Sequence, residues 1–252
     1  MNQFFLLNPV VIYIFVALFA LAIGSLLNVI IYRLPFMLRD EYKNMCRSIS
    51  ELSDVTSPTI NLFFPRSFCP KCNYKIRAVE NIPLISYLFL MGRCRQCKQT
   101  ISWRYPFVEL LYMSLSLYSL YTFGFNQTFL FTLIFFALLI PMCFIDIDYQ
   151  ILPDSLTLGF LWVGLIANTQ NLFTTLPDAV LSAAGAYLSL WLFIKLFYLI
   201  TGKIGMGHGD FKLFAAFGAW FGWSQLPLIL MLSSLFGAIV GLMCLKISGK
   251  SH

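Results

Sequence analysis

Seven apolar stretches occupy most of this chain and constrain its fold more than any other feature. They cover residues 9–31, 107–124, 128–146, 155–169, 178–200, 210–223 and 226–246. An α-helix needs about 20 apolar residues to cross a hydrocarbon core of about 30 Å. With 59% hydrophobic and only 11% charged residues, the chain is expected to be an all-α polytopic membrane protein with about seven transmembrane helices. The stretches 155–169 and 210–223 are short for a span, which favours broken or tilted helices there.

The segment 32–106 differs from the rest because it carries most of the charge. It holds 12 of the 17 Lys and Arg residues and 5 of the 11 acidic residues. Positively charged loops remain in the cytoplasm, so we expect this segment to be cytoplasmic and the N-terminus to lie outside. No Lys or Arg precedes the first apolar stretch, which favours a retained helix over a cleaved signal peptide. The sequence shows no internal repeat.

Two CxxC pairs lie in this charged segment, Cys69 with Cys72 and Cys94 with Cys97, and 21 residues separate them. Four thiolates at this spacing are typical of a tetrahedral zinc site, and a reducing cytoplasm favours zinc over disulfides. Four free thiols without a metal are the alternative. Because four protein ligands leave no position for a catalytic water, the predicted zinc is structural. The basic surface around it is better explained by orientation and anionic lipid than by nucleic acid.

The predicted organisation therefore has three parts. Residues 1–31 form a first transmembrane helix, and residues 32–106 form a cytoplasmic loop domain held together by zinc. Residues 107–252 form a transmembrane core that carries the remaining candidate chemistry.

Carboxylates at the ends of apolar stretches are the candidate catalytic groups. Asp146 ends one stretch, and Asp210 begins another within the glycine-rich segment 204–212. Asp148 and Asp154 lie near Asp146, but Asp154 precedes a predicted helix, where an aspartate ordinarily caps. If two such carboxylates face each other, repulsion leaves one protonated and one ionised, which is the arrangement of aspartic proteases.

Glycines flank Asp210 and remove side chains that would keep a substrate backbone away. They are Gly205, Gly207 and Gly209. His208 between them is a candidate proton relay, although a lone histidine in a loop is more often incidental. Paired intramembrane acids serve ion and proton transporters as well as hydrolases. The residues alone therefore leave a peptidase and a non-catalytic transporter or scaffold with a zinc docking loop both open.

Several motifs, taken in order, resemble those of the bacterial type IV prepilin peptidases. They are Gly24–Pro35, Cys69–Cys72, Glu80–Pro83, Gly92–Cys97, Arg104–Glu109, Asp146 with Leu152–Asp154, and Gly207–Lys212. The resemblance implies an inner-membrane enzyme of type IV pilus and type II secretion systems, with its active site facing the cytoplasm. Members of this family are often drawn with eight spans, so eight is the alternative to seven.

The resemblance also implies two activities. It selects Asp146 and Asp210 as the pair that removes a basic leader after a glycine from prepilins and pseudopilins. The new N-terminal residue, usually Phe, would then be methylated with S-adenosyl-L-methionine as donor. The residues implied for methyl transfer lie between 24 and 109 and are Asn28, Arg33, Glu80, Arg93, Arg104 and Glu109. Asp40, Glu41 and Glu80 are candidates for contacting the basic leader.

Overall fold

The computed structural model describes residues 9–49, 61–62, 64–69, 71–77, 80, 82–203 and 207–247. Within these residues the chain is helical, with two isolated β-bridges and no strand. Its contacts divide it into two units, Met1–Pro153 and Asp154–His252, and each is described by itself. The prediction of an all-α protein is confirmed for the described residues.

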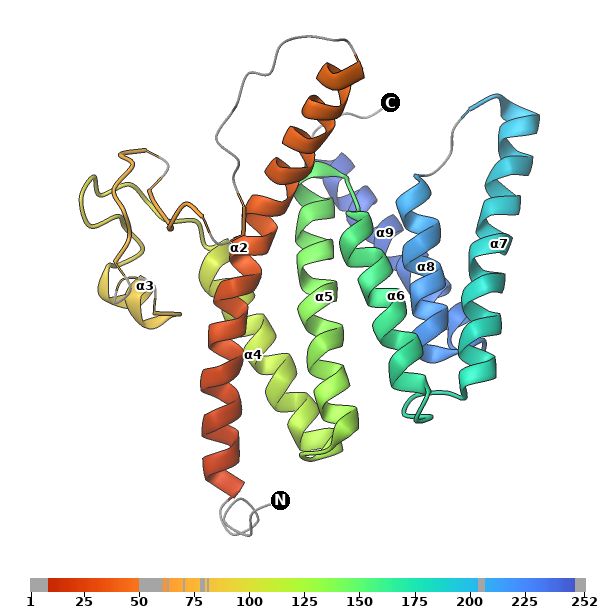
Figure 1. The fold of residues 1–252 in the computed structure, drawn as a ribbon, viewed down its shortest axis with the longest axis horizontal. Helices are drawn as coiled ribbons and strands as arrows, with labels where there is room; N and C mark the ends of the chain where they lie inside the picture. Colours follow the sequence, from red (N-terminus) through yellow and green to blue (C-terminus); the bar gives the residue numbers. More distant parts are fainter. Residues whose placement is uncertain are drawn as a thin grey trace. The chain divides into compact units, whose positions relative to one another are not determined.

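All seven predicted stretches form helices (Figure 1). The first unit contains α2 (Pro9–Ile49), α3 (Ile85–Phe89), α4 (Arg104–Phe123) and α5 (Gln127–Tyr149). The second unit contains α6 (Asp154–Asn168), α7 (Leu176–Thr201), α8 (His208–Phe221) and α9 (Leu226–Ile247). The five-residue helix α3 was not expected from the sequence.

Four of the described helices, α2, α5, α7 and α9, are long and apolar enough to cross a membrane. Helices α6 and α8 have 15 and 14 residues, which at about 1.5 Å per residue is shorter than the hydrocarbon core. Helix α4 has 20 residues but includes Arg104 and Glu109. The chain is therefore a polytopic helical membrane protein, and a count of seven or eight spans remains a prediction.

Helix α2 continues far beyond the apolar stretch that begins it. It has 41 residues and runs through Pro35 to Ile49, so the predicted boundary at residue 32 falls inside a helix. The residues from 41 to 46 are exposed and mostly polar. Hydropathy indicates where apolar surroundings end, whereas a helix continues for as long as its backbone hydrogen bonds do.

Helices α2, α4 and α5 pack against one another in the first unit (Figure 1). The backbones of α2 and α4 approach closely at Gly24, where a Cβ would lie 2.8 Å from the Cα of Glu109. One turn further on, the Asn28 Nδ2 donates to the Tyr105 carbonyl at 3.0 Å. An apolar cluster closes the other end, formed by Val16, Leu120, Phe129 and Leu133.

The core of the second unit is built around Trp220, which is fully buried. Its indole Nε1 donates to the Phe160 carbonyl at 2.9 Å, and the two rings stack. A Cβ at Gly164 would lie 2.6 Å from the indole. The absence of a side chain there gives Trp220 its place between α6 and α8.

Two polar side chains join the helices of this unit. The Asn168 amide at the end of α6 donates to two carbonyls of α8 and accepts two backbone N–H groups from the following loop, so it is fully satisfied although buried. The Ser182 hydroxyl of α7 donates to the Gly218 carbonyl of α8 at 2.7 Å. A Cβ at Gly218 would lie 2.8 Å from the backbone of Ser182.

Replacing Gly218 with alanine should destabilise the protein. Alanine normally stabilises a helix interior by about 1 kcal/mol relative to glycine, but overpacking against a backbone costs about 1–3 kcal/mol. We expect the overpacking to dominate and the midpoint of thermal unfolding in detergent to fall. Gly159→Ala is the matched control, because nothing lies within 4 Å of a Cβ there. An unchanged midpoint for Gly218→Ala would contradict the close approach of α7 and α8.

Candidate functional site

The four cysteines of the two CxxC pairs converge as predicted. The Sγ atoms of Cys69 and Cys97 are 3.7 Å apart, and those of Cys72 and Cys94 are 4.0 Å apart. All four lie within 4.8 Å of one another. Tetrahedral zinc with Zn–S bonds of about 2.3 Å requires S–S separations of about 3.8 Å, whereas a disulfide requires about 2.05 Å. The geometry therefore fits four thiolate ligands around one zinc ion.

The two CxxC pairs share one local conformation. The backbone N–H groups of Cys69 and Cys94 each donate to the carbonyl five residues further on, at 2.9 and 2.8 Å. The residues after each pair, Asn73 and Lys98, have φ values of 54° and 58°, and an isolated β-bridge flanks each turn. This repetition is visible in the backbone although the sequence shows no internal repeat.

The turn at Cys69 favours the thiolate form of this residue, whereas desolvation and the neighbouring cysteines raise the pKa of Cys72 to about 11. Backbone N–H groups of Cys72 and Lys71 lie against the sulfur of Cys69 and lower its pKa to about 6. Because a thiol must lose its proton to bind metal, this turn prepares Cys69 as a ligand near neutral pH.

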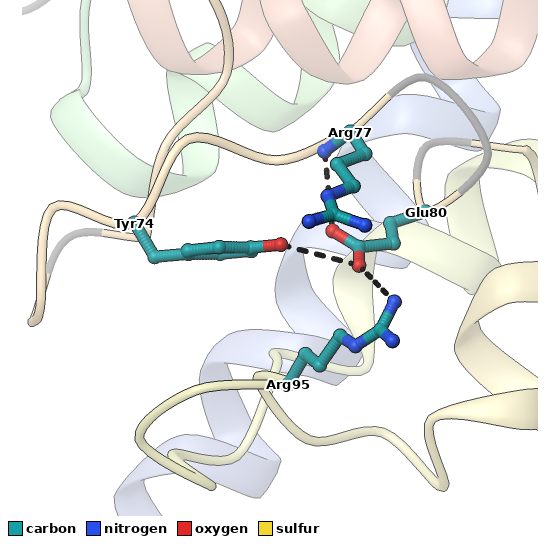
Figure 2. Close-up of polar contacts among 4 residues, drawn as sticks. All are labelled: Tyr74, Arg77, Glu80 and Arg95. Atoms are coloured by element: carbon teal, nitrogen blue, oxygen red, sulfur yellow. Dashed lines mark hydrogen bonds and ion pairs between the residues drawn. The ribbon is translucent and has the colours of Figure 1, made fainter.

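Glu80 connects the two cysteine turns (Figure 2). Its carboxylate accepts from Arg95 at 2.8 Å, from the Tyr74 hydroxyl at 3.3 Å and from the backbone N–H of Arg77 at 3.1 Å. The Glu80 side chain is only 8% exposed. The carboxylate is thus engaged within the loop, which disfavours a role for Glu80 in contacting a leader peptide.

A cavity of about 800 Å³ lies in the first unit, where α2 and α4 meet the cysteine loop. Five of the six residues implied for methyl transfer line it: Asn28, Arg33, Glu80, Arg104 and Glu109. The sixth, Arg93, does not line the cavity and forms the β-bridge of the second cysteine turn. Residues that lie as far apart in the sequence as Asn28 and Glu109 thus share one cavity, and their role in methyl transfer remains a prediction.

The arginines around the cavity already have acceptors. Arg33 donates to the backbone carbonyls of residues 61, 62 and 65. Arg95 pairs with Glu80, and Arg104 pairs with Asp148 at the end of α5. The cations of the wall therefore hold the structure together, although the Arg104 Nε is buried without a hydrogen-bond partner.

The cavity fits S-adenosyl-L-methionine in size and chemistry. Ligand pockets commonly measure about 300–1,000 Å³ and combine apolar walls with a few polar groups. The wall is mostly apolar and includes the aromatic rings of Tyr32, Tyr74 and Tyr105. The Asn28 Oδ1 is buried in it without a hydrogen-bond partner, and such an acceptor is ordinarily satisfied.

An unexpected turn holds Glu109, which is 7% exposed. Its Oε2 accepts from the backbone N–H of Leu84 at 2.8 Å. Leu84 has φ 57° and ψ −49°, and the next N–H donates back to the Pro83 carbonyl. A γ-turn of this hand is rare and strained, at a cost of about 1–3 kcal/mol. No sequence pattern signalled that this backbone would clamp a carboxylate 25 residues away.

Asp146 lies in the last turn of α5, and its carbonyl accepts the N–H of Gln150, the left-handed residue that ends the helix. Its side chain is exposed within the first unit. Asp148 pairs with Arg104, which leaves Asp146 as the more available carboxylate of this turn. An edge-to-face contact between Phe36 and Tyr149 further ties the end of α5 to α2.

Asp210 is the third residue of α8, and its N–H donates to the carbonyl of Gly207, the N-cap residue, at 3.3 Å. A negative charge is stabilised at this end of a helix. The side chain is half-buried. The His208 ring is exposed and packs against Phe211 at 5.5 Å between centroids. Residues 204–206, including Gly205, lie outside the described residues, and Gly209 directly precedes Asp210.

Lys212 ends the Gly207–Lys212 motif, but the sequence analysis assigned it no role of its own. Its Nζ lies 2.6 Å from Asp154 Oδ1, which joins the start of α6 to the first turns of α8. Asp154 therefore has an ion-pair role, whereas the capping role expected of it stays a prediction. Asp146 belongs to the first unit and Asp210 to the second, so their pairing remains a prediction.

Replacing Cys94 with serine should remove most of the bound zinc, because a structural zinc site requires all four ligands. The measurement is zinc per chain in the purified protein by mass spectrometry, with an expected value near one for the parent. Cys143→Ser is the matched control, because this exposed cysteine lies outside the cluster. Equal zinc contents in the parent and in Cys94→Ser would contradict the site.

Replacing Glu80 with glutamine should destabilise the cysteine loop at neutral pH. Hydrogen bonds from Arg95 and from the Arg77 backbone lower the pKa of Glu80. This stabilisation is therefore present above the ordinary glutamate pKa of about 4.3 and is lost as pH falls through the lowered value. Proteolysis of the loop should be faster in Glu80→Gln at pH 7, and the difference from the parent should disappear in acid. A difference that is independent of pH would contradict the role of the ionised carboxylate.

Comparison with known proteins shows the family to which the chain belongs. The bacterial Peptidase A24 N-terminal domain matches residues 18–123, and the type IV leader peptidase family matches residues 133–242. A Legionella pneumophila protein named prepilin leader peptidase/N-methyltransferase is 58% identical over 252 residues, covering 100% of this chain and 88% of the relative. Relatives of the same name from Stutzerimonas stutzeri and Aeromonas hydrophila are 46% and 51% identical, over 97% and 90% of this chain and 85% and 79% of theirs. No solved structure shows significant similarity to the chain. From its motifs, its helices and these relatives, the chain belongs to the type IV leader peptidase family.

Proposed function

We propose that this chain removes the leader of type IV prepilins and pseudopilins and methylates the new N-terminal residue. Cleavage is assigned to Asp146 and Asp210, and methyl transfer to the cavity at the junction of α2, α4 and the cysteine loop. The observation that carries the second assignment is the convergence of five implied residues on one cavity. The first rests on the family and on the positions of the two aspartates at helix ends.

Leader removal requires the two carboxylates to reach one water molecule together. The ionised aspartate accepts a proton from this water, which then attacks the carbonyl carbon of the scissile peptide bond. The protonated aspartate donates to the carbonyl oxygen or to the departing nitrogen, and the C–N bond breaks. Because Asp148 and Asp154 are held by Arg104 and Lys212, they are less suited to this task.

Methyl transfer divides the wall residues into two groups. S-adenosyl-L-methionine supplies an electrophilic methyl group when bound. Asn28 and Glu109 carry the polar acceptors of the wall, and the aromatic side chains offer faces on which a nucleobase can stack. Arg33, Glu80 and Arg104 hold the wall in place through the contacts described above. The zinc ion bound by Cys69, Cys72, Cys94 and Cys97 would stabilise the loop.

The distribution of charge supports an inner-membrane enzyme with its N-terminus outside and its active site facing the cytoplasm. The basic loop would rest against anionic lipid, and it would repel a basic leader. On the extension of α2, Glu41 is exposed and Asp40 is half-buried, and the Asp40 carboxylate lies 3.9 Å from the Lys43 Nζ. These two acids are our candidates for contacting the leader.

Replacing either Asp146 or Asp210 with asparagine should abolish leader removal, because asparagine can neither accept the proton from water nor donate an acidic one. We expect a loss of at least about 100-fold, since a positioned acid or base contributes about 10²–10⁴-fold. The measurement is mass spectrometry of the N-terminus of a pilin, together with protein abundance. Asp178→Asn is the control, because Asp178 lies in the first turn of α7. The alternative function as an ion transporter predicts lost ion flux with cleavage intact.

The two activities should be separable. Asp210→Asn should still methylate a synthetic pilin peptide that already lacks its leader, because the cavity is built entirely from the first unit. Incorporation of a labelled methyl group measures this. If methylation is lost together with cleavage while the protein still folds, the assignment of two separate sites is wrong.

A further inference from the structure

The wall of the 800 Å³ cavity contains one buried carboxylate with which no cation of the described residues is paired. Glu109 has no ion-pair partner among the described residues, whereas the other two carboxylates near the wall, Glu80 and Asp148, are each paired with an arginine. A buried carboxylate without a cation is unfavourable and marks a functional position in a membrane protein. The missing partner is therefore to be sought in a ligand.

Donors from the protein orient Glu109 without neutralising it. Its Oε2 accepts from the strained Leu84 turn, and the Ser25 side chain also hydrogen-bonds to the carboxylate. A carboxylate offers about four acceptor positions, so capacity remains for further donors. The close approach at Gly24 fixes the backbone of Glu109 against α2. The carboxylate is thus held in place and still able to accept.

Asn28 supplies a second acceptor to the same cavity. Its Nδ2 lies 3.0 Å from the Tyr105 carbonyl and 3.4 Å from the Gly24 carbonyl. Two carbonyl neighbours require the amide nitrogen on that side, which assigns the orientation of the group. The Oδ1 therefore points away from these carbonyls. It is buried without a hydrogen-bond partner, and Asn28 as a whole is only 3% exposed.

The arginines of the wall cannot complete this site. Arg33 donates to backbone carbonyls, and Arg95 and Arg104 are held by their own carboxylates. Among the described residues, the site at Glu109 and Asn28 therefore presents acceptors with which no cation of the protein is paired. It suits a cation that carries several N–H donors, whereas Mg²⁺ or Ca²⁺ would demand about six oxygen ligands.

We propose that Glu109 and the Asn28 Oδ1 form a binding site for an alkylammonium group. The inference rests on the proposed methyl transfer, for which two alkylammonium groups are relevant. One is the N-terminal amine of a processed pilin, and the other is the amino group of the methionine half of S-adenosyl-L-methionine. Both have the same chemistry, and a binding experiment distinguishes them.

The test uses the full-length protein in nanodiscs and the variant Glu109→Gln, which keeps the shape of the side chain and removes its charge. Two pairs of probes are titrated. The first pair is a peptide that begins with Phe and carries a free N-terminus, and its N-acetyl form. The second pair is S-adenosyl-L-methionine and 5′-methylthioadenosine, which lacks the amino-acid half. The readout is the ratio of Kd values within each pair, measured by calorimetry.

The parent should prefer the amine-bearing member of one pair, and Glu109→Gln should reduce that preference by about 10-fold or more, as expected for a lost charge-assisted hydrogen bond. A change in the peptide pair assigns the site to the pilin amine, and a change in the second pair assigns it to the methyl donor. Glu109→Asp should restore part of the preference because it keeps the charge. Asp178→Asn is the matched control, since it removes one carboxylate charge in the second unit and outside the cavity.

If neither ratio changes in Glu109→Gln, the alkylammonium site is wrong while the cavity can still bind the methyl donor. If the parent binds neither S-adenosyl-L-methionine nor the peptide, the proposed methyl-transfer function fails and the inference fails with it. Zinc content and the thermal unfolding midpoint report whether Glu109→Gln is folded. If Glu109→Gln does not fold, the same Kd ratios are measured with Asn28→Leu, which removes the second acceptor and keeps the carboxylate. Unchanged ratios in Asn28→Leu would then contradict the alkylammonium site.

Discussion

The crossing of α2 and α4 depends on Gly24, because any side chain there would meet the backbone of Glu109. This approach sets the distance between the two helices, and with it the position of Asn28 one turn further on. The cavity wall, the clamp at Leu84 and the ends of the cysteine loop are all placed relative to this crossing. The site in the first unit therefore requires that residue 24 is glycine and has no side chain.

Glycines also allow the helices of the second unit to approach one another closely. Gly218 and Gly164 allow α8 to approach α7 and to seat the Trp220 ring against α6. Asn168 then satisfies the carbonyls left open at the end of α8. A short helix that is fixed so firmly at its C-terminal end presents its first turn, with Asp210, in a defined direction within the unit.

Features that depend on local spacing could be predicted from the sequence, and features that depend on tertiary contacts could not. The CxxC pairs converge as expected because two short turns and four equivalent ligands leave few alternatives. All seven apolar stretches form helices because their hydrophobicity is local information. By contrast, nothing near Asp148 indicates its arginine 44 residues earlier, and nothing near Leu84 indicates its strained backbone. The extension of α2 was missed because the charge that marks the edge of a membrane does not stop a helix.

The site residues divide in the same way. The resemblance to the family identified five cavity residues, but it could not distinguish those that hold the wall from those that face a ligand. Glu80 and Glu109 are both acidic, and only the structure reveals that the first is paired and the second is not. The chemical role of each residue follows from its neighbours more than from its type.

The twin cysteine turns have a consequence for the cell that makes this protein. Cys69 and Cys94 form part of the cavity wall, so a zinc ion bound by the loop would also shape that wall. Asp146 and Asp210 lie on α5 and α8, outside the cysteine cluster. In bacteria starved of zinc, newly made enzyme would therefore lose methylation before it lost leader removal. Pili would then be assembled from subunits that are cleaved but not methylated.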